Sequence, residues 1–166
     1  CVGVKKLEKK YFDKIIIARP VVNVENDIGF LPGNLNNKMD PWTRPIFDIL
    51  FEHFEYTDIE RKLRDKVIEI VPLGYMRGRT FKNSYIIADE MQNCNENEIL
   101  SLLTRLDENS KLIITGDLEQ KDVNFKSGLE IFLEKLEIFN KYKNENSICY
   151  IKFNNDDIFR SKIVKK

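Results

Sequence analysis

The sequence predicts an α/β fold in which helices cover a largely parallel β-sheet. Short, continuous apolar runs such as Ile15–Ile17 and Tyr85–Ala88 are typical of strands buried on both faces. Segments with apolar residues at helical spacing follow these runs, and this alternation is typical of right-handed β-α-β units. The 166 residues, of which 42% are hydrophobic, suffice for one globular core, so 1–166 is predicted to be a single domain.

The first half of the chain contains one predicted strand and three predicted helices. Residues 2–12 place apolar side chains at helical spacing, and the strand Ile15–Ile17 follows. Asn, Gly and Pro are concentrated in the next stretch, so 21–41 is predicted to be a long surface loop. Apolar residues then recur on one helix face in Trp42–Phe54, and a shorter helix is predicted over Ile59–Lys66.

The second half alternates strands with helices more regularly. Its predicted strands are Ile68–Leu73, Tyr85–Ala88, Leu112–Thr115 and Ser147–Phe153, and its predicted helices are Asn95–Leu106 and Gly128–Phe139. The helix that begins at Asn95 carries Glu96 and Glu98 in its first turn, where carboxylates interact favourably with the helix dipole.

Charge, cysteine content and hydropathy exclude several classes of protein. The 27 Lys and Arg residues balance the 27 Asp and Glu residues, so a nucleic-acid site would have to be a local groove. The three cysteines are widely spaced and form no CxxC pair, which argues against a disulfide framework and a zinc cluster and favours a reducing cytoplasm. No apolar run approaches the roughly 20 residues of a membrane-spanning helix, so no membrane partner is expected.

Two adjacent carboxylates follow the strand at Tyr85–Ala88. In open α/β sheets ligands bind beyond the carboxyl ends of the strands, where Asp89 and Glu90 are expected. Asp89 is therefore predicted to hold a phosphate-bound Mg²⁺ ion through water, and Glu90 to orient and deprotonate an attacking water. The structural alternative is that both residues only cap the next helix.

A second polar motif follows the strand at Leu112–Thr115. Gly116 and Asp117 come directly after this strand, and Gln120 follows three residues later. From the end of a neighbouring strand, the Gln120 amide could reach a terminal phosphate or the attacking water. The alternative is a simple turn in which Gly116 adopts positive φ and Asp117 closes the turn. Asp117 lies 28 residues after Asp89, with one predicted helix between them, and two such acidic strand ends are more specific than either motif alone.

Six motifs in this order resemble the PhoH family. They are Arg19-Pro20, Gly29-Phe-Leu-Pro-Gly33, Tyr75-Met-Arg-Gly-Arg-Thr80, Asp89-Glu-Met-Gln-Asn93, Leu103-Thr-Arg105 and Thr115-Gly-Asp-Leu-Glu-Gln120, and they cover roughly residues 14 to 130. The resemblance implies a cytoplasmic ATP-binding protein with a three-layer, RecA-like P-loop NTPase core similar to that of superfamily 1 helicases. It also implies RNA as a substrate of some members.

The resemblance implies roles for individual residues. Asp89 and Glu90, within the region 85–93, would be the Walker B pair that serves ATP and Mg²⁺. Within the sensor region 112–122, Asp117 and Gln120 would sense the γ-phosphate, and Thr115 would join the nucleotide-binding residues. Asp157-Ile-Phe-Arg160-Ser161 resembles the family's C-terminal arginine motif, so Arg160 would stabilise charge on the transferring phosphoryl group.

The P-loop of the family, G-x-x-x-x-G-K-[ST], is absent from the printed sequence. Residues 2–12 resemble the end of the helix that follows a P-loop, and the chain opens on Cys1, so an N-terminally truncated domain is expected. In the RecA-like order the P-loop strand lies inside the sheet. Without it we expect unpaired strand edges, impaired catalysis and self-association of this chain.

Arginines near two strand ends suggest a site for RNA or single-stranded DNA. Arg19 follows the strand at Ile15–Ile17, and Arg77 and Arg79 precede the Walker B strand together with Tyr75, whose ring could stack on a base. The alternative is that these arginines pair with Asp or Glu. By analogy with RecA-like ATPases, a homo-oligomeric ring is a further expectation.

Three functions follow from these observations. The favoured hypothesis is ATP hydrolysis coupled to binding or unwinding of RNA or single-stranded DNA. The alternative is a catalytically inactive PhoH-like remnant that binds nucleic acid or forms oligomers. A third, a metal-dependent nuclease, would use Asp89, Glu90 and Asp117 as metal ligands without ATP.

Overall fold

The computed structural model describes residues 2–21, 35–142, 148–154 and 157 of the chain. The chain divides into two compact units, Cys1–Glu134 and Lys135–Lys166. The first unit contains the whole β-sheet and every described residue of the predicted site. Among the described residues, no helix combines the length and the apolar character needed to cross a bilayer.

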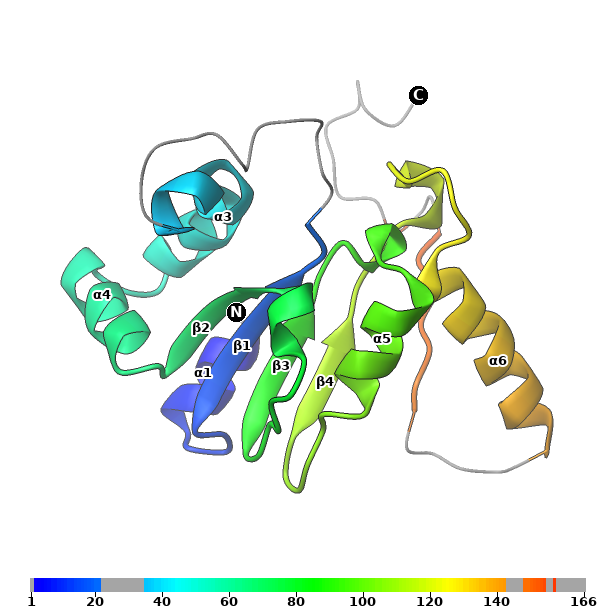
Figure 1. Ribbon diagram of the computed structural model, residues 1–166. Helices are drawn as coiled ribbons and strands as arrows, with labels where there is room; N and C mark the ends of the chain where they lie inside the picture. Colours follow the sequence, from blue (N-terminus) through cyan, green and yellow to red (C-terminus); the bar gives the residue numbers. More distant parts are fainter. Residues whose placement is uncertain (1, 22–34, 143–147, 155–156, 158–166) are drawn as a thin grey trace. The chain divides into compact units, whose positions relative to one another are not determined.

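A four-stranded parallel sheet forms the centre of the first unit (Figure 1). Its strands are β1 (Lys14–Arg19), β2 (Ile68–Pro72), β3 (Ser84–Ala88) and β4 (Lys111–Ile114), in the order β2-β1-β3-β4. Within the described part of the chain β4 pairs with β3 on one side only, so it forms an edge of this sheet. The parallel pairing confirms the predicted α/β fold, and it is consistent with the RecA-like core expected of the PhoH family.

Helices follow or precede the strands as the apolar patterns predict. They are α1 (Val2–Glu8), α3 (Leu35–Phe51), α4 (Tyr56–Arg64), α5 (Glu96–Leu103) and α6 (Gly128–Tyr142), with 3₁₀ turns η1 (Leu73–Met76), η2 (Met91–Asn93) and η3 (Leu118–Gln120). The three 3₁₀ turns follow β2, β3 and β4 closely, so each strand delivers the chain into a tight turn at its carboxyl end.

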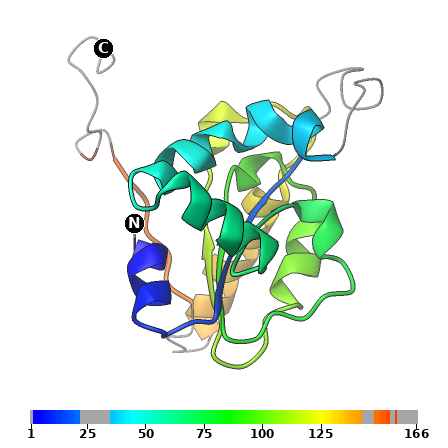
Figure 2. The same cartoon turned by 90° about the vertical axis from the view of Figure 1, so that its left-hand side faces the viewer.

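Two apolar clusters hold the layers of the first unit together, one on each face of the sheet. On one face Ile16 and Ile86 pack with Ile99 and Leu102 of α5. On the other face the cluster gathers residues of the sheet, α1, α3 and α4: Val4, Ile15, Ile17, Ile46, Leu50, Ile59, Ile68 and Tyr85. The alternation of neighbouring residues between the two faces is the period of two expected of a strand. Figure 2 shows α1 and α5 on opposite sides of the sheet.

Several predicted boundaries are wrong. The loop predicted over 21–41 is helical from Leu35, because α3 begins there, before Trp42. The helix predicted over 2–12 ends at Glu8, and Lys10 turns the chain with a φ of 57°. The helix predicted to Leu106 ends at Leu103, because Leu106 pairs with Phe81 in an isolated parallel bridge.

The last predicted strand, Ser147–Phe153, is also wrong over its described residues. Residues 148–153 have no regular secondary structure in the second unit. Alternating apolar residues favour an extended chain, but a strand exists only where another strand accepts its hydrogen bonds. Ser147 lies outside the described residues.

Candidate nucleotide site at the carboxyl edge of the sheet

The parallel register brings the ends of β1, β3 and β4 together. Ala18 pairs with Ala88, and Ala88 pairs with Ile114, so the next residues of the three strands lie side by side. The backbone N–H of Asp89 donates to the carbonyl of Ala18 at 2.9 Å, and the N–H of Thr115 donates to that of Ala88 at the same distance. This register places Arg19, Asp89 and Thr115 at one edge.

Asp89 makes a contact with each neighbouring strand. The Thr115 hydroxyl donates to its Oδ1 at 2.6 Å, and the Arg19 guanidinium lies 3.0 Å from its Oδ2. The Asp89 side chain is still 35% exposed, so solvent reaches the carboxylate. Its position is therefore fixed from two sides while one side remains open to a ligand.

Glu90 adopts an unusual backbone conformation. Its φ of 57° lies in the left-handed region, which a residue with a side chain occupies at some cost in energy. The Gln92 amide donates to Glu90 Oε2 at 2.7 Å, and Arg19 lies 3.4 Å from Oε1. The left-handed turn directs the chain into η2 and leaves half of the Glu90 side chain exposed.

The loop after β4 lies against the loop after β3. The Gln120 amide donates to Asp117 Oδ2 at 2.7 Å, and the backbone N–H of Glu119 donates to Asp117 Oδ1 at 3.0 Å. Asp117 and Gln120 are both exposed. The structure thus brings the predicted sensor pair together and leaves it accessible.

Gly116 shows why a glycine stands between Thr115 and Asp117. The structural alternative, a turn in which Gly116 adopts positive φ, is wrong on this point, because Gly78 is the one glycine with a positive φ among the described residues. A Cβ on Gly116 would instead lie 2.7 Å from a Leu129 methyl group and 2.9 Å from the Gln92 side-chain oxygen. The close approach of these side chains, rather than the turn, therefore requires glycine.

Two amides in this site were not assigned a role from the sequence. Gln92 and Asn93 are 1% and 8% exposed, and each reaches from η2 to the loop after β4. The backbone N–H of Asp117 donates to the Gln92 side-chain oxygen at 3.1 Å, and Asn93 exchanges two hydrogen bonds with Asp122. The available sequence signal was their place between the apolar residues Met91 and Cys94, which predicts burial.

The arginines predicted to bind nucleic acid have different surroundings. Arg19 faces Asp89 and Glu90, and Arg79 lies 2.7 Å from Glu69 with its guanidinium over the Phe81 ring. These are the ion pairs that the sequence left open as the structural alternative. Arg77 is exposed on the turn after η1, and Arg160 lies outside the described residues.

The carboxylates at this edge could hold a metal ion only together with further ligands. In the described part of the chain no three His, Cys, Asp or Glu residues cluster as a metal-binding group. Mg²⁺ commonly uses one or two carboxylates and takes its remaining ligands from phosphates and waters, which Asp89 and Glu90 could accommodate. The three-carboxylate nuclease site has no support among these residues.

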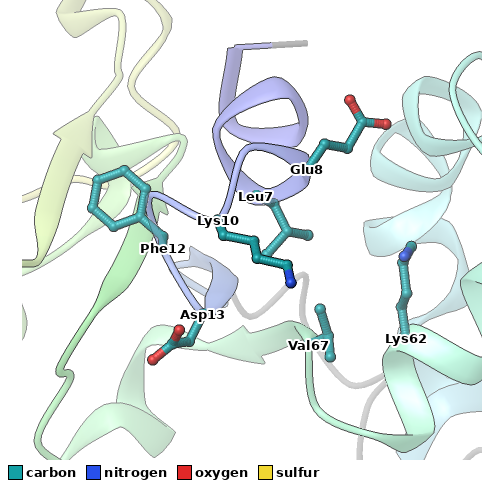
Figure 3. Close-up of a pocket in the computed structure, with 7 residues that line it drawn as sticks. All are labelled: Leu7, Glu8, Lys10, Phe12, Asp13, Lys62 and Val67. Atoms are coloured by element: carbon teal, nitrogen blue, oxygen red, sulfur yellow. The ribbon is translucent and has the colours of Figure 1, made fainter.

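One shallow depression of about 350 Å³ lies elsewhere on the first unit (Figure 3). Phe12, Asp13 and Val67, which line it, precede β1 and β2. The depression is therefore at the amino ends of the strands, on the opposite edge from Asp89.

Comparison with known proteins gives consistent matches to one family. The profile of the family described as "PhoH-like protein" matches residues 1–166. The chain is 40% identical over 166 residues to a PhoH-like protein of Bacillus subtilis, covering 99% of this chain and 50% of that protein. It is 36% identical over 161 residues to Protein PhoH of Escherichia coli K12, covering 95% of this chain and 44% of that protein. The chain spans about half the length of the curated relatives it matches.

Proposed function

This chain belongs to the PhoH-like protein family, and on that premise we propose that it carries the acidic and sensor residues of a magnesium-dependent ATP hydrolysis site. The observation that supports this proposal most directly is the convergence of Asp89, Glu90 and Thr115 with the Asp117–Gln120 turn at one open sheet edge. Parallel sheets bind ligands at this edge. The motifs that resemble the family lie on the same residues.

Each side chain has a separate task in this proposal. A bound Mg²⁺ ion would neutralise charge on the phosphates of ATP. Asp89 would hold the water shell of that ion, and Thr115 fixes the orientation of the Asp89 carboxylate by donating to Oδ1. Glu90 accepts the proton of the attacking water. Asp117 and Gln120 would contact the terminal phosphate from the neighbouring loop.

Arg19 makes it possible for two adjacent carboxylates to lie together at this edge. Its guanidinium contacts both Asp89 and Glu90, so it offsets their mutual repulsion. A cation that binds to Asp89 competes with Arg19 for the same oxygen atoms. We therefore propose that Arg19 acts in the acidic site rather than in binding nucleic acid.

The phosphates of ATP also need a cradle of backbone N–H groups, and the printed sequence contains no G-x-x-x-x-G-K-[ST] segment. ATP hydrolysis is therefore to be measured on the protein as its gene encodes it.

The test is the substitution Glu90→Gln. It removes the base but keeps the size of the side chain, so we expect Mg²⁺-dependent ATP hydrolysis to fall by roughly 10² or more while ATP binding persists. Glu108→Gln is the matched control, because Glu108 is an exposed carboxylate on the loop before β4, away from the carboxyl edge of the sheet. Turnover that survives Glu90→Gln, or falls equally in both variants, would remove Glu90 from this role.

We further propose that the η1 turn contacts RNA or single-stranded DNA. Leu73 and Met76 anchor this turn in the core, whereas Tyr75 is 63% exposed and Arg77 is exposed beside it. An exposed aromatic ring next to a cation is a common arrangement for stacking on a base and contacting its phosphate.

The test of this second proposal compares two arginines. Arg77→Ala should weaken binding of single-stranded RNA and reduce the slope of its salt dependence by about one. Arg79→Ala serves as the control, because Arg79 already pairs with Glu69. An unchanged salt slope in Arg77→Ala refutes the contact.

A further inference from the structure

Two consecutive buried amides connect the loop after β3 with the loop after β4. We call Gln92 and Asn93 the amide pair. Asn93 donates to Asp122 Oδ2 at 3.1 Å and accepts from the Asp122 backbone N–H at 2.9 Å. Gln92 accepts from the Asp117 backbone N–H at 3.1 Å. Both amides therefore hold the loop after β4, but at two different residues of that loop.

Of the amide pair, only Gln92 also contacts the Glu90 side chain. Its Nε2 donates to Glu90 Oε2 at 2.7 Å, while its Oε1 accepts from Asp117. One buried amide thus joins the carboxylate proposed as the base to the first residue of the sensor turn. Within this contact the nitrogen must donate and the oxygen must accept, so neither Glu nor Met can replace both interactions.

The surroundings of Gln92 restrict any movement of its side chain. The side chain is 1% exposed, and Gly116 approaches so closely that a Cβ there would lie 2.9 Å from Gln92 Oε1. A further contact joins Nε2 to the carbonyl of Gln120 at 3.4 Å. Because the amide has little free space, a displacement of Asp117 or Gln120 has to move Gln92.

We propose that Gln92 is a positioning residue that holds the Glu90 carboxylate and the Asp117–Gln120 turn together, so that a ligand contacting the turn also sets the position of Glu90. This inference rests on the proposed function for its catalytic consequence. The Asn93 side chain holds the same loop, but it makes no hydrogen bond to the Glu90 side chain. Only its backbone N–H donates to the Glu90 carbonyl, at 3.1 Å, so the Asn93 amide contributes rigidity without this coupling.

Three substitutions distinguish the effects of the two hydrogen bonds that the Gln92 amide makes to Glu90 and Asp117. Gln92→Met removes both hydrogen bonds at similar volume. Gln92→Glu keeps an acceptor for the Asp117 N–H but replaces the donor to Glu90 with a second carboxylate. Asn93→Leu is the matched control, because it removes the neighbouring amide and its bonds to Asp122 and leaves those of Glu90 in place.

The first readout is hydrogen exchange of single backbone amides, measured by NMR, and it needs no activity. Gln92→Met should speed exchange of the Asp117 N–H by about tenfold, the effect of losing one hydrogen bond. Gln92→Glu should leave that amide protected, and Asn93→Leu should speed exchange at Asp122 instead. If Gln92→Met leaves the Asp117 amide as protected as in the unmodified protein, the proposed link does not exist.

The second readout is ATP hydrolysis by the protein as its gene encodes it. Both Gln92 variants should lower kcat by about tenfold or more with KM for ATP within about threefold, whereas Asn93→Leu should change kcat by less than about twofold. Equal losses in all three variants would show a merely structural role and overturn the proposal. If the unmodified protein hydrolyses no ATP while the exchange pattern holds, the proposed function fails, and the holding role of Gln92 stands.

Discussion

Gly116→Ala tests whether close packing at the end of β4 limits the stability of this fold. The added Cβ would lie 2.7 Å from Leu129 Cδ2, 2.9 Å from Gln92 Oε1 and 3.1 Å from the Gln92 backbone N. Carbon atoms pack without strain at about 3.5–4.0 Å, so all three neighbours must move apart by several tenths of an ångström. Leu129 is 7% exposed within the apolar cluster, and it has little room to give.

The magnitude follows from two opposing effects. Overpacking a dense site costs about 1–3 kcal/mol, and a Gly-to-Ala change at a compatible φ returns about 0.4–1 kcal/mol by restricting the unfolded chain. We therefore expect the free energy of unfolding to fall by about 1–2 kcal/mol in urea titrations followed by far-ultraviolet circular dichroism.

Gly74→Ala is the matched control for this experiment. A Cβ on Gly74 would meet no atom within 4 Å, and the φ of Gly74 is not positive. The same chemical change there should leave stability unchanged or raise it slightly. If Gly116→Ala proves as stable as Gly74→Ala, the close approach does not restrict this position, and the argument for glycine is refuted.

Three further predictions concern the cysteines and the sheet edge. Burial raises the pKa of the Cys94 thiol to about 12, so iodoacetamide at pH 8 should modify Cys94 slower by about 10³ than an ordinary thiol, and far slower than the exposed Cys149. The unfolded thiol ionises with a pKa near 9.0 and the native thiol only with a pKa near 12, so the free energy of unfolding should fall as pH rises between these values, by at most about 1.4 kcal/mol per pH unit. Cys94→Ala should lack that part of the fall. Identical pH profiles of the two proteins would contradict the burial argument. The 166-residue chain should self-associate at roughly micromolar to millimolar concentration, because β4 is an edge strand of the described sheet and its apolar residues Leu112, Ile113 and Ile114 are only half-buried. A single monomeric species in sedimentation velocity would refute this prediction.

The sheet and the acidic site could be predicted because simple rules determine both. A run such as Ile15–Ile17 becomes a buried parallel strand wherever helices cover both faces, as the two apolar clusters show. The carboxyl ends of parallel strands share one edge, so the residues after Ala88 and Ile114 had to lie near each other. The contact between Thr115 and Asp89 follows from this register.

The features that the sequence did not predict depend on partners far along the chain. The first turns of α3 contain Asn and Pro, which have low helix propensity, yet propensity is a weak term that the tertiary contacts of later residues such as Ile46 and Leu50 override. The role of Gln92 requires Glu90 and Asp117 to lie within reach of one side chain. No local sequence pattern predicts that these residues lie so close together.

The strained backbone at Glu90 is explained by what holds the residues on either side of it. The N–H of Asp89 donates to Ala18 in β1, and the N–H of Met91 donates to the carbonyl of Thr115 at the end of β4. Glu90 is thus the single residue between two anchors on opposite sides of β3, and its φ of 57° is the turn that connects them. The sheet therefore maintains the left-handed conformation, and the Gln92 amide then fixes the direction of the Glu90 carboxylate. Residues of the chain itself thus hold Asp89 and Glu90 in place, which is the preorganisation that the proposed acid–base chemistry would require.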